Sequence, residues 1–280
     1  MSLPAGTRVG AVRLQVADLD RSLGFYERVI GLPALDRSDG VARLGAEPGR
    51  PLVELHERPG ARPVPRRGRL GLYHFAILLP ERAALGRLLR HLGETDVPAG
   101  MSDHLVSEAI YLSDPDGLGI EVYADRPRDT WEYEGGQLVM ATNPLDVSGL
   151  LAAAGPDRWT GAPAGTVIGH IHLYVGDLER AAAFYERGLG LDRTVWNYPG
   201  ALFMSAGGYH HHLGINTWAA GAPPATEADA RLLDWELLVP DAREGNQAIE
   251  RIAAAGAPVQ PEPGGGVARD PWGTAVRLRA

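Results

Sequence analysis

Two stretches of the chain are near copies of each other: VADLDRSLGFYERVIGL at Val16–Leu32 and VGDLERAAAFYERGLGL at Val175–Leu191. They align without gaps. Each follows a run of alternating apolar and polar residues, GAVRLQV or GHIHLYV, and such alternation is typical of a half-buried strand. A repeat of this kind predicts that the same strand–helix unit occurs twice in the fold.

Each copy carries the signals of a helix with defined ends. Asp18 and Asp177 stand where a side chain caps the first turn, and Gly31 and Gly190 stand where the helix would stop. The helices are expected to bury Leu19, Leu23 and Tyr26 in the first copy, and Leu178, Ala182 and Tyr185 in the second. We therefore interpret both tyrosines as packing residues.

A second, weaker pair of similar stretches lies between these copies and after them. LYHFAILLPERAALGRLLRHL (72–92) resembles LLDWELLVPDAREGNQAIERI (232–252), and each reads as a strand, a proline at a helix start, and an amphipathic helix. Each is followed by a strand behind an Asp-Pro-x-Gly turn, DPDGLGIEVY (114–123) or DPWGTAVRLR (270–279). The chain therefore contains four related modules.

Together these patterns predict an α+β fold of four βαβββ modules. We place the modules at 9–57, 70–125, 166–218 and 230–280. The first two form a domain at 1–125 and the last two a domain at 166–280, while a linker at 126–165 carries a short helix near 147–154.

Composition excludes several classes of protein. The 280 residues carry a net charge of −8 and no block of like charges, so nucleic acid is not an expected partner. The absence of cysteine excludes thiolate metal sites and a cysteine nucleophile. We interpret the arginine-rich stretch Arg62–Arg69 as a solvated linker, and expect a cytoplasmic protein without a membrane partner. A homo-oligomer is left open.

The modules and the repeated Asp-Leu…Phe-Tyr-Glu-Arg motif resemble the vicinal oxygen chelate superfamily over nearly the whole chain. That superfamily includes glyoxalase I, bleomycin- and fosfomycin-resistance proteins and type I extradiol dioxygenases. The resemblance implies that paired modules curl their strands into open barrels around a metal or ligand, giving two such domains here. The helix motif identifies only the superfamily, because its residues serve packing.

The resemblance also implies where metal ligands would lie, on the first and last strands of a module. Those places hold His74 and Glu121 in module two and His170 in module three. Strand alternation puts all three side chains on the face away from the helices. Two imidazoles and one carboxylate suit a non-haem Fe(II) centre with open positions, although Mn(II), Ni(II) or Zn(II) is a possible alternative.

The same places are empty of ligands in the outer modules. Module one has Ala11, and module four has Asp234 and Arg277. Neither half of the chain alone contains the two histidines and the glutamate. We therefore predict that module two pairs with module three around the metal, and that module one pairs with module four around a vestigial site.

The run HLVSEAIYLSDPDGLGIE, His104–Glu121, resembles the long motif of extradiol dioxygenases. By that resemblance Glu121 is a metal ligand, Tyr111 hydrogen-bonds a substrate oxygen and His104 lines the pocket. The run departs from the motif at Ser102, two residues before its first histidine. The implied reaction is cleavage of a small aromatic diol by O2, which makes these two molecules the expected partners.

Module three adds GGYHHHLGIN, Gly207–Asn216, where related enzymes carry an acid–base histidine. Alternation favours His212 for this role, whereas spacing by homology favours His211. The expected substrate-binding residues are His172, His210 and Asn216. The triple histidine could instead belong to an exposed polar strand, and Trp196 or Trp218 could line an aromatic pocket.

Two other functions remain open at the level of sequence. A glyoxalase-type lyase or isomerase would require a fourth protein ligand, and Gly214 stands near the place where module three would supply it. A metal-free protein that binds a drug or another small molecule would have no use for the three ligands beside Tyr111 and His104.

Overall fold

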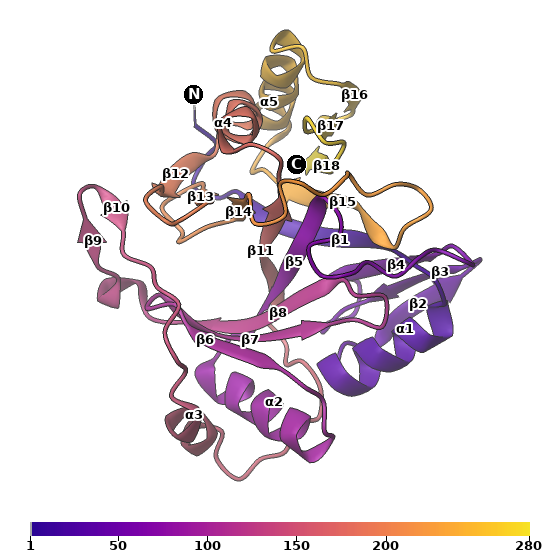
Figure 1. Ribbon diagram of the computed structural model, residues 1–280, viewed down its shortest axis with the longest axis vertical. Coiled ribbons are helices and arrows are strands. Elements are labelled where there is room, and N and C mark those ends of the chain that lie inside the picture. Colours follow the sequence, from indigo (N-terminus) through magenta and orange to yellow (C-terminus); the bar gives the residue numbers. More distant parts are fainter. Residues whose placement is uncertain (1) are drawn as a thin grey trace.

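The computed structural model describes residues 2–280 and contains the four expected modules (Figure 1). Module one comprises β1 (Arg8–Val16), α1 (Leu19–Phe25), the π-helical turn η1 (Tyr26–Ile30), β2 (Ala34–Ser38), β3 (Val41–Leu44) and β4 (Val53–Glu57). Module two comprises β5 (Gly71–Leu78), α2 (Arg82–Glu94), β6 (Gly100–Asp103), β7 (Ser107–Ser113) and β8 (Gly119–Asp125).

The second half repeats this order. Module three comprises β11 (Val167–Tyr174), α4 (Leu178–Ala182), the π-helical turn η3 (Ala183–Leu189), β12 (Asp192–Val195), β13 (Ala201–Ser205) and β14 (Leu213–Asn216). Module four comprises β15 (Arg231–Leu238), α5 (Ala242–Ala254), β16 (Val259–Glu262), β17 (Gly265–Arg269) and β18 (Ala275–Arg279).

The strands form two curled eight-stranded sheets that each draw on both halves of the chain. The inner sheet, built from modules two and three, has the order β12-β13-β14-β11-β5-β8-β7-β6. The outer sheet, from modules one and four, has the order β16-β17-β18-β15-β1-β4-β3-β2. Antiparallel β5–β11 and β1–β15 pairs join the modules. The predicted pairing of two with three and one with four is confirmed.

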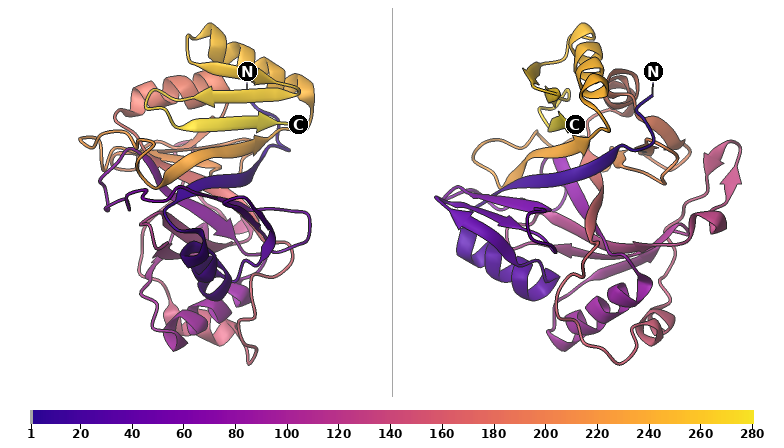
Figure 2. Two further views of the ribbon diagram at one scale, coloured as in Figure 1. Left: turned by 90° about the vertical axis from the view of Figure 1, so that its right-hand side faces the viewer. Right: turned by 180° about the vertical axis from the view of Figure 1, so that it is seen from behind.

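The main hydrophobic core lies between the two sheets and under the helices. Val12 of β1, Phe75 of β5, Ile171 of β11 and Trp235 of β15 all belong to it, and β1 contacts β11 while β15 contacts β5. The views in Figure 2 show α5 and α4 at one end of the molecule and α2 and α3 at the other. The opposite face of the inner sheet is left for polar side chains.

The ends of the repeated helices follow the sequence signals. The side chain of Asp18 accepts a hydrogen bond from the backbone N–H of Arg21, and that of Asp177 accepts one from Arg180. Gly31 and Gly190 stop the helices at φ values of 79° and 97°, which favour glycine. The π-helical last turn in both copies is a feature that the sequence analysis did not predict.

The linker contains the predicted helix and one unexpected element. Helix α3 spans Val147–Ala153, beside α2. A short hairpin, β9 (Tyr133–Glu134) with β10 (Gln137–Leu138), follows the 3₁₀ turn η2 (Arg128–Thr130) and projects beside β12 at the open side of the inner sheet (Figure 1). Among residues 2–280, no helix has the length and apolar character needed to cross a membrane.

The tyrosine of each repeated motif contacts an aspartate of the following module. The hydroxyl of Tyr26 donates a 3.4 Å hydrogen bond to Asp114, and that of Tyr185 donates a 3.0 Å bond to Asp270. Both aspartates begin the Asp-Pro-x-Gly turns and are buried. The tyrosines therefore pack in the core as predicted, and in addition each one satisfies a buried carboxyl group of the neighbouring module.

Asp114 makes stability depend on pH. Burial raises its pKa to about 7, although N–H groups of Leu118 and Asp116 donate to it. In the unfolded chain the value is about 3.9, so the folded state binds this proton more tightly. The stabilising contribution of the protonated form is complete below about pH 4 and is lost as the pH rises to about 7.

We therefore expect that the variant Asp114→Asn does not lose stability in this way as the pH rises. Relative to the wild type, the free energy of unfolding of the variant should rise by about 2–4 kcal/mol between pH 4 and 7. Urea titrations over this range measure it, with the exposed Asp129→Asn as control. A difference between variant and wild type that does not change with pH would contradict the assignment.

Candidate metal centre

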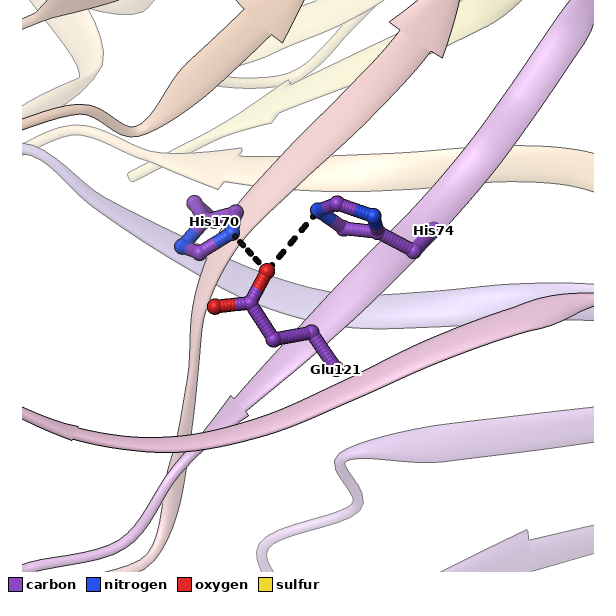
Figure 3. A group of neighbouring side chains, drawn as sticks. All are labelled: His74, Glu121 and His170. Carbon is purple, nitrogen blue, oxygen red and sulfur yellow. Dashed lines mark hydrogen bonds and ion pairs between the residues drawn. The ribbon is translucent and has the colours of Figure 1, made fainter. Parts of the chain in front are cut away.

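Three side chains from three strands converge on the polar face of the inner sheet. His74 comes from β5, Glu121 from β8 and His170 from β11, and Figure 3 shows both imidazoles directed at the carboxylate. Nε2 of His74 lies 3.0 Å and Nε2 of His170 lies 3.3 Å from Oε2 of Glu121. All three residues are buried, and their ligand atoms lie within 4.8 Å of one another.

Strand register explains this convergence. Ala76 of β5 is paired with Glu121 on the parallel neighbour β8 and with His170 on the antiparallel neighbour β11. Its small side chain leaves room above the strand, and His74 stands two residues away on the same face. The sheet therefore places the three side chains around one point without any loop.

The protonation states and unpaired atoms suit a divalent metal. Burial opposes ionisation of Glu121, but the charges and hydrogen bonds of His170 and His74 outweigh it, so the pKa of Glu121 lies well below its usual value. Burial lowers the pKa of His170 to about 4. Nδ1 of His74 and Nδ1 of His170 are buried without a hydrogen-bond partner among the described residues. A carboxylate with neutral imidazoles is the form that binds metal.

His74 and Glu121 line a cavity of about 1040 Å³, and His170 lies next to them, with its Nε2 3.3 Å from Oε2 of Glu121. Its polar lining includes His74, Glu121, His104, Tyr111, His172 and His211, and its aromatic lining includes Tyr73, Tyr174, Tyr198, Phe203 and Trp218. Trp218 thus lines the cavity, whereas Trp196 does not. Such a volume is far larger than a single aromatic ring needs, since drug-sized ligands occupy sites of about 300–1,000 Å³.

Tyr111 and His104 form a hydrogen-bonded pair on one wall. Nδ1 of His104 lies 2.6 Å from the carbonyl oxygen of Ala141, which can only accept, so Nδ1 carries a proton. In the neutral ring Nε2 then accepts, and the Tyr111 hydroxyl, 2.6 Å away, donates to it. The lone pairs of this hydroxyl remain to accept a hydrogen bond from a cavity ligand. Burial, followed by the charge of Glu121, raises the pKa of Tyr111 well above 10.

The triple histidine is arranged differently from the expectation based on alternation. His211 lines the cavity, with its ring centroid 4.0 Å from that of His170. His210 and His212 do not line it. The expectation failed because β14 begins only at Leu213, so strand alternation does not extend through residues 210–212.

The other two histidines have structural partners. Nε2 of His210 lies 2.9 Å from Asp125, and its Nδ1 lies 2.7 Å from Nδ1 of His211. Nδ1 of His212 accepts a hydrogen bond from the backbone N–H of Ala206. The expected placement of His212 and His210 at the cavity is therefore wrong, while the acid–base role itself stays a prediction. The open alternative, His211, has the required position.

Asn216 also has another position than expected. It does not line the cavity, but its amide nitrogen lies 2.9 Å from Nε2 of His172, which does. The Asn216 side-chain oxygen accepts from the N–H of Trp218, so the amide nitrogen is the donor to His172. Asn216 therefore holds the ring of His172 in place instead of contacting a ligand.

The equivalent place in the outer sheet holds a cation from the chain itself. Arg13 of β1 is paired with Asp234 of β15 in the same way as His172 with His74, and Glu236 is paired with Arg277 as Ala76 is with Glu121. The guanidinium of Arg13 makes ion pairs with Asp234 and, at 2.8 Å, with Glu236. As predicted, this site lacks the two histidines and the glutamate.

One carboxylate of the outer site was missed in the sequence. Glu54 on β4 occupies the position that Gly214 has in module three, since it pairs with Arg13 as Gly214 pairs with His172. It is neutralised by Arg43 at 2.9 Å and lies 2.6 Å from His56. The half-exposed His56 is therefore a surface residue with a defined partner.

The arginine-rich stretch is solvent-exposed at Arg62, Arg66 and Arg67, as its composition predicts, but it is also anchored to the fold. Arg62 and Arg69 form ion pairs of 2.8 and 2.9 Å with buried Asp229, and Arg66 and Arg67 line the cavity. Sequence reasoning missed this because the partner carboxylate lies far along the chain.

Comparisons with known proteins agree with this architecture. The family model described as the Glyoxalase/Bleomycin resistance protein/Dioxygenase superfamily matches residues 8–122 and 167–278. The chain is 49% identical over 259 residues to the Catechol-2,3-dioxygenase of Bacillus subtilis (strain 168), covering 91% of this chain and 90% of that protein.

Two solved structures share the fold. A Bacillus subtilis crystal structure matches with a TM-score of 0.67 and 17% identity, over 99% of this chain and 86% of the other. Glyoxalase I from Zea mays matches with a TM-score of 0.57 and 18% identity, over 98% and 92% of the two chains. At such identities the likeness concerns the fold alone.

Metal content tests the cluster directly. We expect His74→Ala, Glu121→Ala and His170→Ala each to reduce bound divalent metal from near one per chain to near zero, because each removes one of three ligands. Elemental analysis after reconstitution and desalting gives the count. The matched control is Asp234→Ala, at the place in the outer sheet that corresponds to His74, and it should keep its metal. Loss of metal in the control alone would contradict the assignment.

Proposed function

The chain belongs to the Glyoxalase/Bleomycin resistance protein/Dioxygenase superfamily, and from this premise we propose that it is a non-haem Fe(II) extradiol dioxygenase that opens the ring of a catechol-type aromatic. The coarser assignment, a dioxygenase-like role, is supported by the 49% identity to a protein named Catechol-2,3-dioxygenase. The iron and the substrate class are our proposal.

One observation carries it: the ligand atoms of His74, Glu121 and His170 lie within 4.8 Å of one another beside a large cavity that His74 and Glu121 line. Iron bound by two imidazoles and one carboxylate would keep positions at which the substrate oxygens and O2 bind side by side. The cavity residues would bind and orient the ring and exclude water around it. The aromatic walls give an apolar surface for the ring itself.

Tyr111 and His104 support recognition of a diol. The Tyr111 hydroxyl donates a hydrogen bond to His104, so its lone pairs are free to accept a hydrogen bond from a substrate hydroxyl in the cavity. His104 is in turn fixed by the carbonyl oxygen of Ala141. The pair therefore positions one substrate oxygen and can take up its proton through the phenol–imidazole contact.

His211 is the residue best placed for proton transfer to a reacting oxygen. It lines the cavity beside His170, and burial, followed by the neighbouring charges of His170 and His210, lowers its pKa well below 6.5. Its Nδ1 contacts His210, which Asp125 holds from the other side. A neutral, fixed imidazole in this place can accept a proton from the diol and return it to the cleaved product.

A glyoxalase-type lyase is the competing function, and strand register argues against it. The position in module three that corresponds to Glu121 holds Gly214, whose Cα lies under the ring of His172. A glutamate there could not be accommodated, because an added Cβ would lie 2.9 Å from that ring. The fourth protein ligand expected for such enzymes is thus missing. A metal-free binding protein would not need the His74–Glu121–His170 cluster.

The test is anaerobic loading with Fe(II), followed by addition of catechol and air. Our proposal expects a yellow ring-opened product and consumption of about one O2 per ring. Tight zinc or nickel binding without O2 uptake across several catechols would favour the lyase. A protein that retains no metal under any loading condition would favour the binding protein.

The histidine assignment has its own test. We expect His211→Asn to lower kcat by about 10²–10⁴-fold, because it removes the acid–base group from the cavity. His212→Asn serves as the matched control, since it lies outside the cavity, and should change kcat by less than about threefold. Iron content of both variants is measured alongside. Equal losses in kcat at equal iron content would contradict the assignment.

A further inference from the structure

The outer part of the cavity is flanked by two arginines, Arg66 and Arg67, on the loop between β4 and β5. The ion pairs among residues 2–280 include Arg62 and Arg69 on the same loop but neither Arg66 nor Arg67. Both side chains are exposed to the solvent that fills the cavity mouth. Their charges are therefore available to a molecule that enters.

The loop that carries the two arginines is fixed on both sides. The Arg62 and Arg69 guanidinium groups hold buried Asp229, and the N–H of Val64 donates a 2.8 Å hydrogen bond to the carbonyl oxygen of Asp116. Between these anchors, the N–H of Gly68 donates a 2.8 Å bond to the carbonyl oxygen of Pro65 and closes a turn. Arg66 and Arg67 form the two central residues of this turn.

The turn contains an arginine where the backbone favours glycine. Arg67 has a φ of 58°, in the left-handed region, and the third position of such turns is usually occupied by glycine or asparagine. A long charged residue in this conformation is strained. The sequence therefore has an arginine that lines the cavity at a backbone position where glycine or asparagine would be more stable.

The rest of the lining contributes little negative charge. Its acidic residue is Glu121, at the metal site, although the chain as a whole carries a net charge of −8. Tyr73 and Tyr174 line the cavity as a tyrosine wall: their ring centroids lie 4.8 Å apart, and that of Tyr73 lies 4.6 Å from that of His74. Burial raises the pKa of Tyr174 to about 12, and the positive charges of Arg67 and Arg66 act against this rise, so the two charges reach the wall.

We propose that Arg66 and Arg67 form a subsite for an anionic group, and that the substrate is a catechol whose ring substituent ends in a carboxylate. This inference rests on the proposed function for the diol end. The diol would bind at His74, Glu121 and His170, the ring against the tyrosine wall, and the carboxylate at the guanidinium groups. Arginine is suited to this task because its planar fork binds carboxylates in a bidentate manner.

The test compares 3-(2,3-dihydroxyphenyl)propanoate and 3-(3,4-dihydroxyphenyl)propanoate, each with its uncharged methyl ester. The side chain is on the ring carbon next to the diol in the first isomer and one carbon further away in the second. The Fe(II)-loaded wild type should have a higher kcat/KM for the acid than for the ester. In the double variant Arg66→Gln/Arg67→Asn this ratio should fall by about fivefold to tenfold. Asparagine is chosen because it tolerates the left-handed backbone.

Two controls separate the subsite from general effects. Arg187→Gln removes an exposed arginine that does not line the cavity, and should leave the ratio unchanged. Added salt should lower kcat/KM for the acid more than for the ester, because it screens exposed charges over about 10 Å at 0.1 M. An unchanged ratio in the double variant, or a wild type that prefers the ester, would overturn the inference.

Binding without turnover distinguishes the two proposals. Calorimetry under anaerobic conditions, with the metal-loaded protein, measures the affinity for acid and ester independently of ring cleavage. If neither ring is opened but the acid binds more tightly and the double variant loses this preference, the anionic subsite stands and the dioxygenase proposal fails. If rings are opened without any preference for the acid, the dioxygenase proposal stands and the anionic subsite fails.

Discussion

Antiparallel pairing of β5 with β11 is the contact on which the candidate site depends. It joins modules from opposite halves of the chain, and its register sets Ala76 beside His170 while β8 sets Glu121 beside Ala76. A shift by one residue would turn the imidazoles to the core face, since strand side chains alternate. The site is therefore as rigid as the sheet, and the apolar core beneath the sheet fixes its geometry.

The outer sheet shows what the same geometry does with different residues. Arg13 supplies a permanent positive charge among Asp234, Glu236 and Glu54, at the place where the inner sheet gathers its candidate ligands. Buried carboxylates need a counter-charge, and either a metal ion or a guanidinium can provide it. Only the metal leaves positions for substrate. The inner sheet thus keeps a group of candidate metal ligands, whereas the outer sheet fills the equivalent place with ion pairs.

The sequence predicted what regular strands and local caps control, and it failed where the backbone is irregular. The family resemblance pointed to His74, Glu121 and His170, and alternation gave the correct face for them because they lie inside strands. Residues 210–212 precede β14, and alternation misplaced His212 there. The roles of Arg66 and Arg67 could not be predicted, because their loop is positioned by Asp229 and Asp116, which lie in other modules.

The nested pairing of modules has a consequence for synthesis on the ribosome. All strands of the inner sheet have been made once Asn216 has emerged, whereas β1, the first strand made, obtains its neighbour β15 only when residues 231–238 follow. Long-range pairing of this kind is slow, and an unpaired strand edge invites aggregation. During synthesis β1 therefore has only β4 as a neighbour until β15 follows, whereas every strand of the inner sheet is already available for pairing.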